Sequence, residues 1–324
     1  MRQQYPQLGL GILCGLFGKT RNAFYEHQRR ATAQALLDGL VLALVVDIRG
    51  DLPRLGTRKL HFLLLPRLGE YAGRVGRDYL FALLASQGLL IRRRKRRVVT
   101  TQTCPTRQHR PNLIAQLRVT QAEQVWVSDI TYVCLLSGWS YLSLITDLYS
   151  HKIVGACLHP DLSVRGTLTS LRQALAARAH PHRPLIHHSD RGLQYGAHEY
   201  VTLLEDNGVA LSMTQKGDPY ENAVAERVNG ILKGEFGLGE TLPSFAQAEA
   251  LVGRAVRAYN DLRPHSSCDF LTPTQAHAQE GLLVQRWKNY YQPPPVAAPT
   301  CPPAPAPVRT EFTLSYPPVK SNPD

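Results

Sequence analysis

The stretch VWVSDITYVCL, Val125–Leu135, decides how this chain folds. Most of its residues are β-branched, aromatic or otherwise apolar, which predicts a buried strand. Because successive side chains of a strand point to opposite faces, Asp129 shares a face with Val127 and Val133. A carboxylate within such an apolar strand is costly unless it is paired or binds a cation. Asp129 is therefore the first candidate functional residue.

The residues around this strand predict a sheet with helices packed on it. We expect further strands at 139–146, 153–158, 185–189 and 210–213, and helices at 163–179, 198–206, 219–234 and 244–262. Three strands in a row, followed by strands that alternate with helices, indicate a mixed sheet. The predicted fold class is thus α/β, with a mixed five-stranded sheet and flanking helices.

The first 91 residues predict a small all-α region in front of this sheet. Short helices on either side of Gly18-Lys19-Thr20 form a helix-turn-helix pattern. Residues 31–50, 58–65 and 77–86 also have the apolar spacing of helices.

Positive charge is concentrated in the first third of the chain. Residues 1–118 carry 21 basic and 6 acidic side chains, whereas the remaining 206 residues carry 16 and 19. Segregated positive charge indicates a polyanionic partner. Six consecutive basic residues follow the helical region: Arg92, Arg93, Arg94, Lys95, Arg96 and Arg97. They form either a solvated linker or a segment that contacts phosphates, and their position between two domains favours phosphate contact.

Neither a disulfide framework nor a membrane span is expected. The six cysteines are scattered without a zinc-ligand spacing, which predicts reduced thiols in a cytoplasmic protein. The longest apolar runs, 40–46 and 8–17, are shorter than the roughly 20 residues that cross a bilayer. We therefore predict no membrane partner.

A second carboxylate, Asp190, comes directly after the predicted strand 185–189. It begins a loop at the carboxyl end of that strand, and ligands of open α/β sheets gather at this edge. A third carboxylate must come from the helix predicted at 219–234, which offers Glu221 and Glu226.

Helix geometry distinguishes these two glutamates. Asp218-Pro219-Tyr220-Glu221 is a helix-start signature in which Glu221 completes a capping box, so we assign it a structural role. Glu226 shares one helix face with Lys233, opposite the apolar residues that anchor the helix. Those apolar residues are Val224, Val228 and Ile231. We therefore predict that Glu226 is the third member.

Three carboxylates without Cys or His ligands form a hard-oxygen site that suits Mg²⁺ or Mn²⁺. Two such ions can activate an attacking oxygen and stabilise the leaving one during in-line phosphoryl transfer. Together with the polyanionic partner, this site predicts an enzyme that cleaves or joins nucleic acid.

At these residues the chain resembles the integrase core of bacterial insertion-sequence transposases. The shared motifs are Trp126–Tyr132, His188-Ser189-Asp190-Arg191-Gly192, Glu221-Asn222-Ala223 and Tyr259-Asn260, with Arg263-Pro264-His265. Thirty-five residues separate Asp190 from Glu226, the D-D-35-E spacing that retroviral integrases share. The closest resemblance is to the second-reading-frame (OrfB type) product of the insertion-sequence-three family, over about residues 5–285. Ser128 departs from that pattern, standing where Thr is common, and Leu193 stands where a small polar residue is common.

The resemblance implies a ribonuclease-H-like core with Asp129, Asp190 and Glu226 as the catalytic, metal-binding triad for two ions. It further implies that Lys233 contacts donor DNA and that Asn222 lies in an adjacent mobile loop, and we expect Asn222 and Arg191 to contact DNA as well. We divide the chain into a DNA-binding helical region at 1–91, a basic linker at 92–120, the catalytic core at 121–285 and a proline-rich, disordered tail at 286–324.

The same resemblance implies partners. They are double-stranded DNA, as element ends and target, further copies of the chain in the DNA complex, and the upstream reading-frame product (OrfA). The expected location is the bacterial cytoplasm, at the nucleoid when the protein is bound to DNA.

Some roles remain open. His187 and His188 are expected either to support the site, to contact DNA or to pack at the strand end. Asp147 is either a turn or cap residue or a metal contact. Arg263 and His265 either bind DNA or tie the last helix to the core.

The predicted function is a DNA transposase that cuts and joins without a covalent protein–DNA intermediate. A ribonuclease-H-like nuclease that cuts without joining is one alternative. A catalytically inactive DNA-binding repressor is the other.

Overall fold

The computed structural model describes residues 7–91, 110–215 and 222–286. The basic run Arg92–Arg97, the capping-box segment Asp218–Glu221 and the proline-rich tail lie outside the described residues. The helical region contains α1 (Leu10–Leu16), α2 (Arg21–Asp51), α3 (Thr57–Leu64), two short 3₁₀ turns η1 (Leu65–Arg67) and η2 (Gly69–Arg74), and α4 (Arg77–Ser86).

The core is the predicted mixed five-stranded sheet. Its elements are β1 (Val125–Leu135), β2 (Gly138–Asp147), β3 (Ile153–His159), α5 (Val164–Ala176), β4 (Leu185–Ser189), α6 (His198–Asp206), β5 (Val209–Met213), α7 (Ala223–Glu235), α8 (Phe245–Asp261), η3 (Ser266–Cys268) and α9 (Pro273–His277). The strand order is β3-β2-β1-β4-β5; β1, β2 and β3 are antiparallel neighbours, whereas β4 and β5 run parallel to β1.

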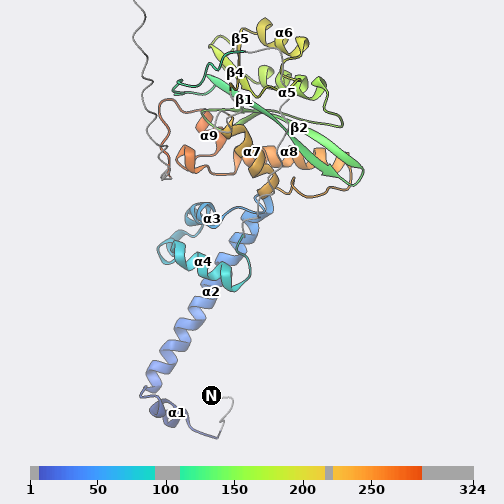
Figure 1. The fold of residues 1–324 in the computed structure, drawn as a ribbon. Coiled ribbons are helices and arrows are strands. Elements are labelled where there is room, and N and C mark those ends of the chain that lie inside the picture. Colours follow the sequence, from blue (N-terminus) through green and yellow to red (C-terminus); the bar gives the residue numbers. More distant parts are fainter. Residues whose placement is uncertain (1–6, 92–109, 216–221, 287–324) are drawn as a thin grey trace, which may run out of the picture. The chain divides into compact units, whose positions relative to one another are not determined.

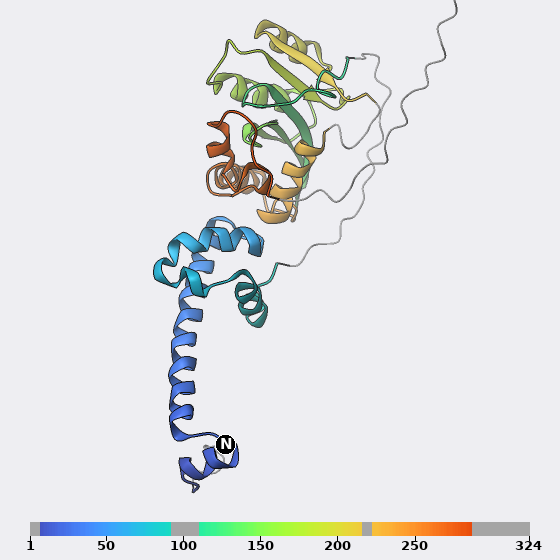
Figure 2. The same cartoon turned by 90° about the vertical axis from the view of Figure 1, so that its left-hand side faces the viewer.

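Helices cover both faces of the sheet, as Figure 1 and the turned view in Figure 2 show. On one face, α5 packs on β2 and β3 and α6 packs on β5, around Trp126 and Leu171. On the other face, α7 and α8 cover β1, β2 and β3, with Val133 and Val228 buried between them. Gly155 lets α5 approach β3, because a Cβ there would lie 2.2 Å from the carbonyl oxygen of Ser170.

Most of the predicted helical region is confirmed, but α2 is longer than the sequence indicated. The turn at Gly18-Lys19-Thr20 separates α1 from α2, and the Thr20 side chain caps α2 by accepting from the backbone N–H of Ala23. The two predicted segments 21–28 and 31–50 form one continuous helix. By length and composition alone, α2 could cross a membrane. The expectation that no segment is long enough counted only uninterrupted apolar runs, and on this point it is corrected.

A buried row of apolar side chains holds α2 against α3 and α4. The α2 residues of this row are Leu37, Val41, Val45 and Ile48. Asp38 reinforces the contact, since it accepts hydrogen bonds from the hydroxyl of Tyr79 on α4 and, at 2.7 Å, from the Gln34 side chain. The C-terminal half of α2 is therefore anchored within its own region.

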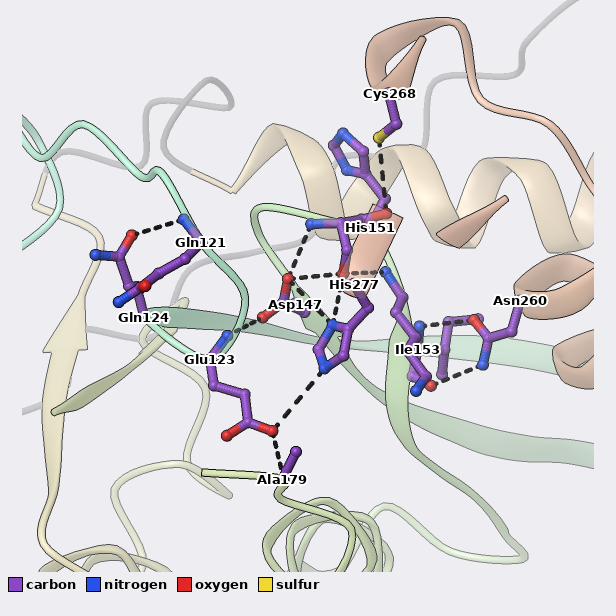
Figure 3. A network of polar contacts seen from close by, with 12 residues as sticks. Gln121, Glu123, Gln124, Asp147, His151, Ile153, Ala179, Asn260, Cys268 and His277 are labelled. Carbon is purple, nitrogen blue, oxygen red and sulfur yellow. Dashed lines mark hydrogen bonds and ion pairs between the residues drawn. The ribbon is translucent and has the colours of Figure 1, made fainter. Parts of the chain in front are cut away.

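A network of polar contacts, drawn in Figure 3, connects the start of β1 with the end of β2 and the C-terminal segment. The Asp147 carboxylate accepts from the backbone N–H groups of Glu123 and Ser150, at 2.8 and 2.9 Å, and from the Ser150 hydroxyl at 2.7 Å. His277 of α9 bonds the same hydroxyl at 2.9 Å. Asp147 is thus a turn residue, one of the two roles expected for it.

Arg263 is completely buried and forms a bidentate ion pair with Glu235, the last residue of α7. Its Nε and Nη2 donate to the two carboxylate oxygens at 2.8 and 2.7 Å, and Nη1 lies 2.8 Å from Nε2 of His265. Burial opposes ionisation of Glu235, but the bonds from Arg263 lower the pKa of this carboxyl. Arg263 and His265 therefore tie the segment after α8 to α7, which settles the alternative left open for them.

We predict that Arg263→Ala lowers the free energy of unfolding by about 3–5 kcal/mol, because it leaves the Glu235 carboxylate without its buried partner. Arg254→Ala, on the exposed face of α8, should change it by less than about 0.5 kcal/mol. Urea denaturation of the two variants measures the difference. An Arg263→Ala loss no larger than that of Arg254→Ala would contradict the structural role.

Candidate active site

Parallel pairing of β1 with β4 brings the first two candidate carboxylates together. The register places Ser128 opposite Ser189. Each serine is followed by an aspartate, Asp129 within β1 and Asp190 directly after β4. The two carboxylates therefore stand on neighbouring strands, at the edge where β4 ends.

Asp129 lies in an environment that opposes its ionisation. Burial, together with the negative charges of Asp190 and Glu226, raises the pKa of Asp129 from 3.8 to about 7. Two hydrogen bonds act in the opposite direction, because they favour the carboxylate. The Asn229 side chain donates to Oδ2 at 2.8 Å, and the backbone N–H of Ile130 donates to Oδ1 at 2.9 Å.

Asp190 begins a loop that its own carboxylate shapes. The backbone N–H of Gly192 donates to Asp190 Oδ1 at 2.9 Å, and a Cβ at Gly192 would lie 3.0 Å from that oxygen. Desolvation raises the pKa of Asp190 as well. Nε of Arg191 donates to the carbonyl of Thr214 at 2.8 Å, so this predicted DNA contact joins the loops after β4 and β5.

Helix α7 presents the third carboxylate. It begins at Ala223, not at the predicted residue 219, and Asn222 precedes its first residue. Glu226 lies exposed in the first turn, while Val228 and Ile231 are buried as predicted. Glu226 acts on the pKa of Asp129, which places its charge near the two aspartates.

Two further side chains, Lys233 of α7 and Asn222 directly before it, interact with β1 at the same site. Lys233 is half-buried, and burial lowers its pKa, while the Asp129 charge raises it. Its ammonium group is therefore close enough to interact with that carboxylate. Asn222 is buried and donates to the carbonyl of Ser128 at 3.0 Å, so it holds β1 next to Asp129.

Asn229 is the site residue that the sequence prediction missed. It is 5% exposed, and besides its bond to Asp129 its Oδ1 has no partner among the described residues. The signal was present, because positions 222, 226, 229 and 233 fall within about 60° of one another on a helix.

A buried polar group supports the two strands from the other face of the sheet. Nε2 of His187 lies 2.8 Å from the Ser128 hydroxyl and 2.9 Å from the hydroxyl of Tyr200 on α6. Burial lowers the pKa of His187 to about 3, so its ring is neutral. Nδ1 of His188 bonds the Ser212 hydroxyl at 2.8 Å. Both histidines are fully buried and therefore pack between strands.

The donor set suits a divalent cation in its chemistry. Asp129, Asp190 and Glu226 supply only oxygen, and their mutual repulsion is the kind that a bound Mg²⁺ or Mn²⁺ relieves. Within the described part of the chain, however, no three Asp, Glu, His or Cys side chains are gathered closely enough to hold an ion. The three carboxylates are electrostatically coupled without forming a closed ligand cluster.

Comparison with known proteins agrees with this arrangement. Two family models, each described as an integrase core domain, match residues 119–219 and 207–273. With the strand order above, they define a ribonuclease-H-like polynucleotidyl transferase, an enzyme of the DDE transposase and integrase class.

Relatives extend the match beyond the core. The insertion element IS600 31 kDa protein of Shigella sonnei is 31% identical over 265 residues, covering 81% of this chain and 96% of that protein. Transposase InsF for insertion sequence IS3A of Escherichia coli is 36% identical over 153 residues, covering 47% and 53%. The chain belongs to the insertion-sequence transposases with an integrase core, and its function is DNA transposition.

A solved structure also aligns with the core. The HTLV-2 integrase catalytic core domain, in complex with magnesium, is 18% identical and covers 49% of this chain and 99% of that one, with a TM-score of 0.41. Because both the identity and the TM-score are low, this alignment carries no argument beyond the topology described above.

We predict that Asp129→Asn stabilises the metal-free protein at pH 8 but not at pH 4. The pKa of Asp129 is raised, so the folded protein gains a proton more readily than the unfolded chain, and stability falls as the pH rises from about 4 to 7. Removing the charge recovers at most about 4 kcal/mol at pH 8, at about 1.4 kcal/mol per pKa unit.

Thermal unfolding in EDTA at the two pH values measures this effect. Asp161→Asn is the matched control, since the Ser163 hydroxyl and backbone N–H lower the pKa of this exposed carboxyl. It should give no stabilisation at pH 8. Equal effects of Asp129→Asn at both pH values would show that charge is not the cause.

We predict that Asn229→Ala raises the Mg²⁺ concentration needed for half-maximal DNA cleavage by on the order of tenfold, because Asp129 loses a donor that orients it. The variant should also shift the acidic limb of the pH–rate profile upward. Asn207→Ala, which removes only a bond to the Leu203 carbonyl, should leave both quantities unchanged. An unaltered metal requirement in Asn229→Ala would argue against a positioning role.

Proposed function

We propose that this transposase cleaves the ends of its insertion sequence and joins them to DNA by direct in-line phosphoryl transfer. Water or a 3′-hydroxyl attacks the phosphodiester, and no covalent protein–DNA intermediate forms. One DNA end attacking the other to form a circle is the joining step expected from the family resemblance.

The observation that carries this proposal is the placement of the carboxylates. Asp129 and Asp190 stand side by side on β1 and β4, and the charge of Glu226 reaches them from α7. Burial and the neighbouring carboxylates oppose the ionisation of Asp129, and a cation bound between the carboxylates would relieve that repulsion. Direct phosphoryl transfer with metal ions does not need a nucleophilic Ser or Cys in the protein.

Each side chain then has a role. Asp129 and Asp190 would hold one divalent ion between them, and Glu226 would complete a second site. Bound there, the two ions would activate the attacking oxygen and stabilise the leaving one. Asn229 orients Asp129, and Lys233, beside the same carboxylate, supplies a positive charge for a DNA phosphate.

We propose double-stranded DNA, as element ends and as target, for the polyanionic partner. The positive charge of residues 1–118 supports this, because neutralising phosphates is the main source of affinity for DNA. Arg191, Asn222 and the run Arg92–Arg97 remain predicted DNA contacts. The corresponding place of action is the bacterial cytoplasm, at the nucleoid.

Assembly is a further part of the proposal. Two element ends must be held together for joining, so the active complex contains more than one copy of the chain. The upstream reading-frame product, OrfA, is the second protein partner that the resemblance implies, and it is to be tested as a fusion and as a separate chain.

We predict that a strand-transfer assay with labelled element ends and Mg²⁺ gives joined products with the wild type and none with Glu226→Gln. Removing the carboxylate charge should lower the rate by at least about a thousandfold, since the metal site then lacks one ligand. Glu221→Gln is the matched control, because Glu221 is the other glutamate considered for this role and precedes the first residue of α7 instead of lying on the face that carries Glu226. It should retain activity within about tenfold.

The alternatives correspond to other outcomes of this assay. Cleaved ends without joined products would indicate a nuclease. Binding of the ends without cleavage, even with OrfA supplied, would indicate an inactive repressor. Loss of activity in Glu221→Gln with retention in Glu226→Gln would reverse the assignment of the third carboxylate.

A further inference from the structure

Helix α2 carries an apolar face that nothing in the described chain covers. In the 18-residue stretch of α2 that is apolar enough to cross a membrane, only 22% of the residues are buried. Leu36 is 72% exposed, Leu40 is 40% exposed and Val46 is 67% exposed. Within residues 7–91, Figures 1 and 2 show the N-terminal half of α2 without another helix alongside it, apart from α1 at its beginning.

The exposed apolar residues form a continuous stripe, which we call the α2 seam. Its members are Leu36, Gly39, Leu40, Ala43, Val46 and Gly50. Apart from the neighbours Gly39 and Leu40, they follow one another at intervals of three and four residues, the spacing of a helix–helix contact. On a helical wheel the seam is centred about 165° from the row formed by Leu37, Val41 and Val45. α2 therefore has two apolar faces, of which α3 and α4 occupy one.

The chemistry of the α2 seam suits a second helix. Leu36, Leu40 and Val46 offer apolar surface, and Gly39 and Ala43 between them let another backbone approach closely. Asp47 lies within the angular range of the seam and is already bonded to Arg67, whereas Asp38 lies about 130° from the seam's centre and is bonded to Tyr79. Covering the stripe therefore leaves no unpaired charge buried.

The distribution of charge along α2 indicates which second helix can pack on the α2 seam and whether it runs parallel or antiparallel. Residues 21–35 carry three basic and one acidic side chain, whereas 36–51 carry three acidic and one basic. A second copy in antiparallel orientation places each basic half against an acidic half. A parallel copy would place like charges together, which is unfavourable. The helix is thus complementary to itself in the antiparallel direction.

We infer that the α2 seam is the contact between two copies of this chain, packed as antiparallel helices about a two-fold axis near Gly39 and Leu40. Such an isologous contact uses the same surface on both copies. It also supports the N-terminal half of α2, since an isolated helix of that length is marginal in water. The contact does not involve the catalytic carboxylates and does not depend on the proposed function.

A membrane is the competing occupant, and two observations disfavour it. One face of α2 is already packed against α3 and α4, so the helix is not free to meet lipid all round. The first half also carries Glu26, Arg29 and Arg30 on its exposed surface. Lipid would have to accept those charges, whereas a second helix pairs them.

The test is sedimentation equilibrium of the full chain without DNA. Protein concentrations from about 0.1 to 100 µM cover dissociation constants of weak to moderate association. We expect a monomer–dimer equilibrium. Leu36→Glu should weaken it at least about tenfold, because it places an unpaired charge within the contact. Ala31→Glu is the matched control, since Ala31 is exposed on the same helix about 120° from the seam, and it should change the equilibrium by less than about twofold.

Circular dichroism shows whether both variants keep the helix content of the wild type. A second, independent measurement uses spin labels at His27→Cys, corrected for the wild-type signal. In the antiparallel dimer the two labels lie about 36 Å apart along the axis, whereas in a parallel pair they lie within about 20 Å.

A monomer throughout the concentration range would overturn the inference, as would a dimer unaffected by Leu36→Glu or labels at the shorter separation. Flotation with vesicles of phosphatidylcholine and phosphatidylglycerol tests the competing occupant. Binding that Leu36→Glu abolishes would assign the α2 seam to lipid. Because no DNA is present, failure here is independent of the outcome of the strand-transfer assay.

Discussion

The parallel pairing of β1 with β4 is the constraint on which the rest of the core depends. It places Asp129 and Asp190 on adjacent strands, where burial and mutual repulsion raise the pKa of Asp129 to about 7. Such an arrangement is stable only because many other contacts keep the strands in register. The neutral imidazole of His187, bonded to the Ser128 hydroxyl from the other face of the sheet, is one of them. The electrostatic strain is thus maintained by apolar and hydrogen-bonded packing around it.

Helix α7 connects this strained centre with the C-terminal part of the core. Asn222 and Asn229 bond β1 directly, while Glu226 and Lys233 share the same helix face. At its other end, α7 is held by the buried ion pair between Glu235 and Arg263. The helix that carries the third carboxylate therefore has defined anchors along its length.

The helical region follows different physics. Its anchored half buries one apolar row of α2 against α3 and α4, and the opposite side of the same helix remains apolar and exposed. The charges of α2 change sign along its length. A single helix can therefore contribute to its own domain and to assembly through two separate faces.

Local sequence rules determined the strands, most helix starts and the two aspartates of this protein, because alternation, capping and turn residues act within a few positions. Ser163 and Ser244, for example, cap their helices through local hydrogen bonds to the backbone. Only the tertiary structure decided the bond from Asn229 to Asp129 and the complete burial of Arg263, because both depend on residues far apart in the chain. The continuous α2 was missed for another reason. The residues between its two predicted segments, Gln28-Arg29-Arg30-Ala31, lack apolar periodicity, but they are good helix formers without Gly or Pro, so the helix continues through them.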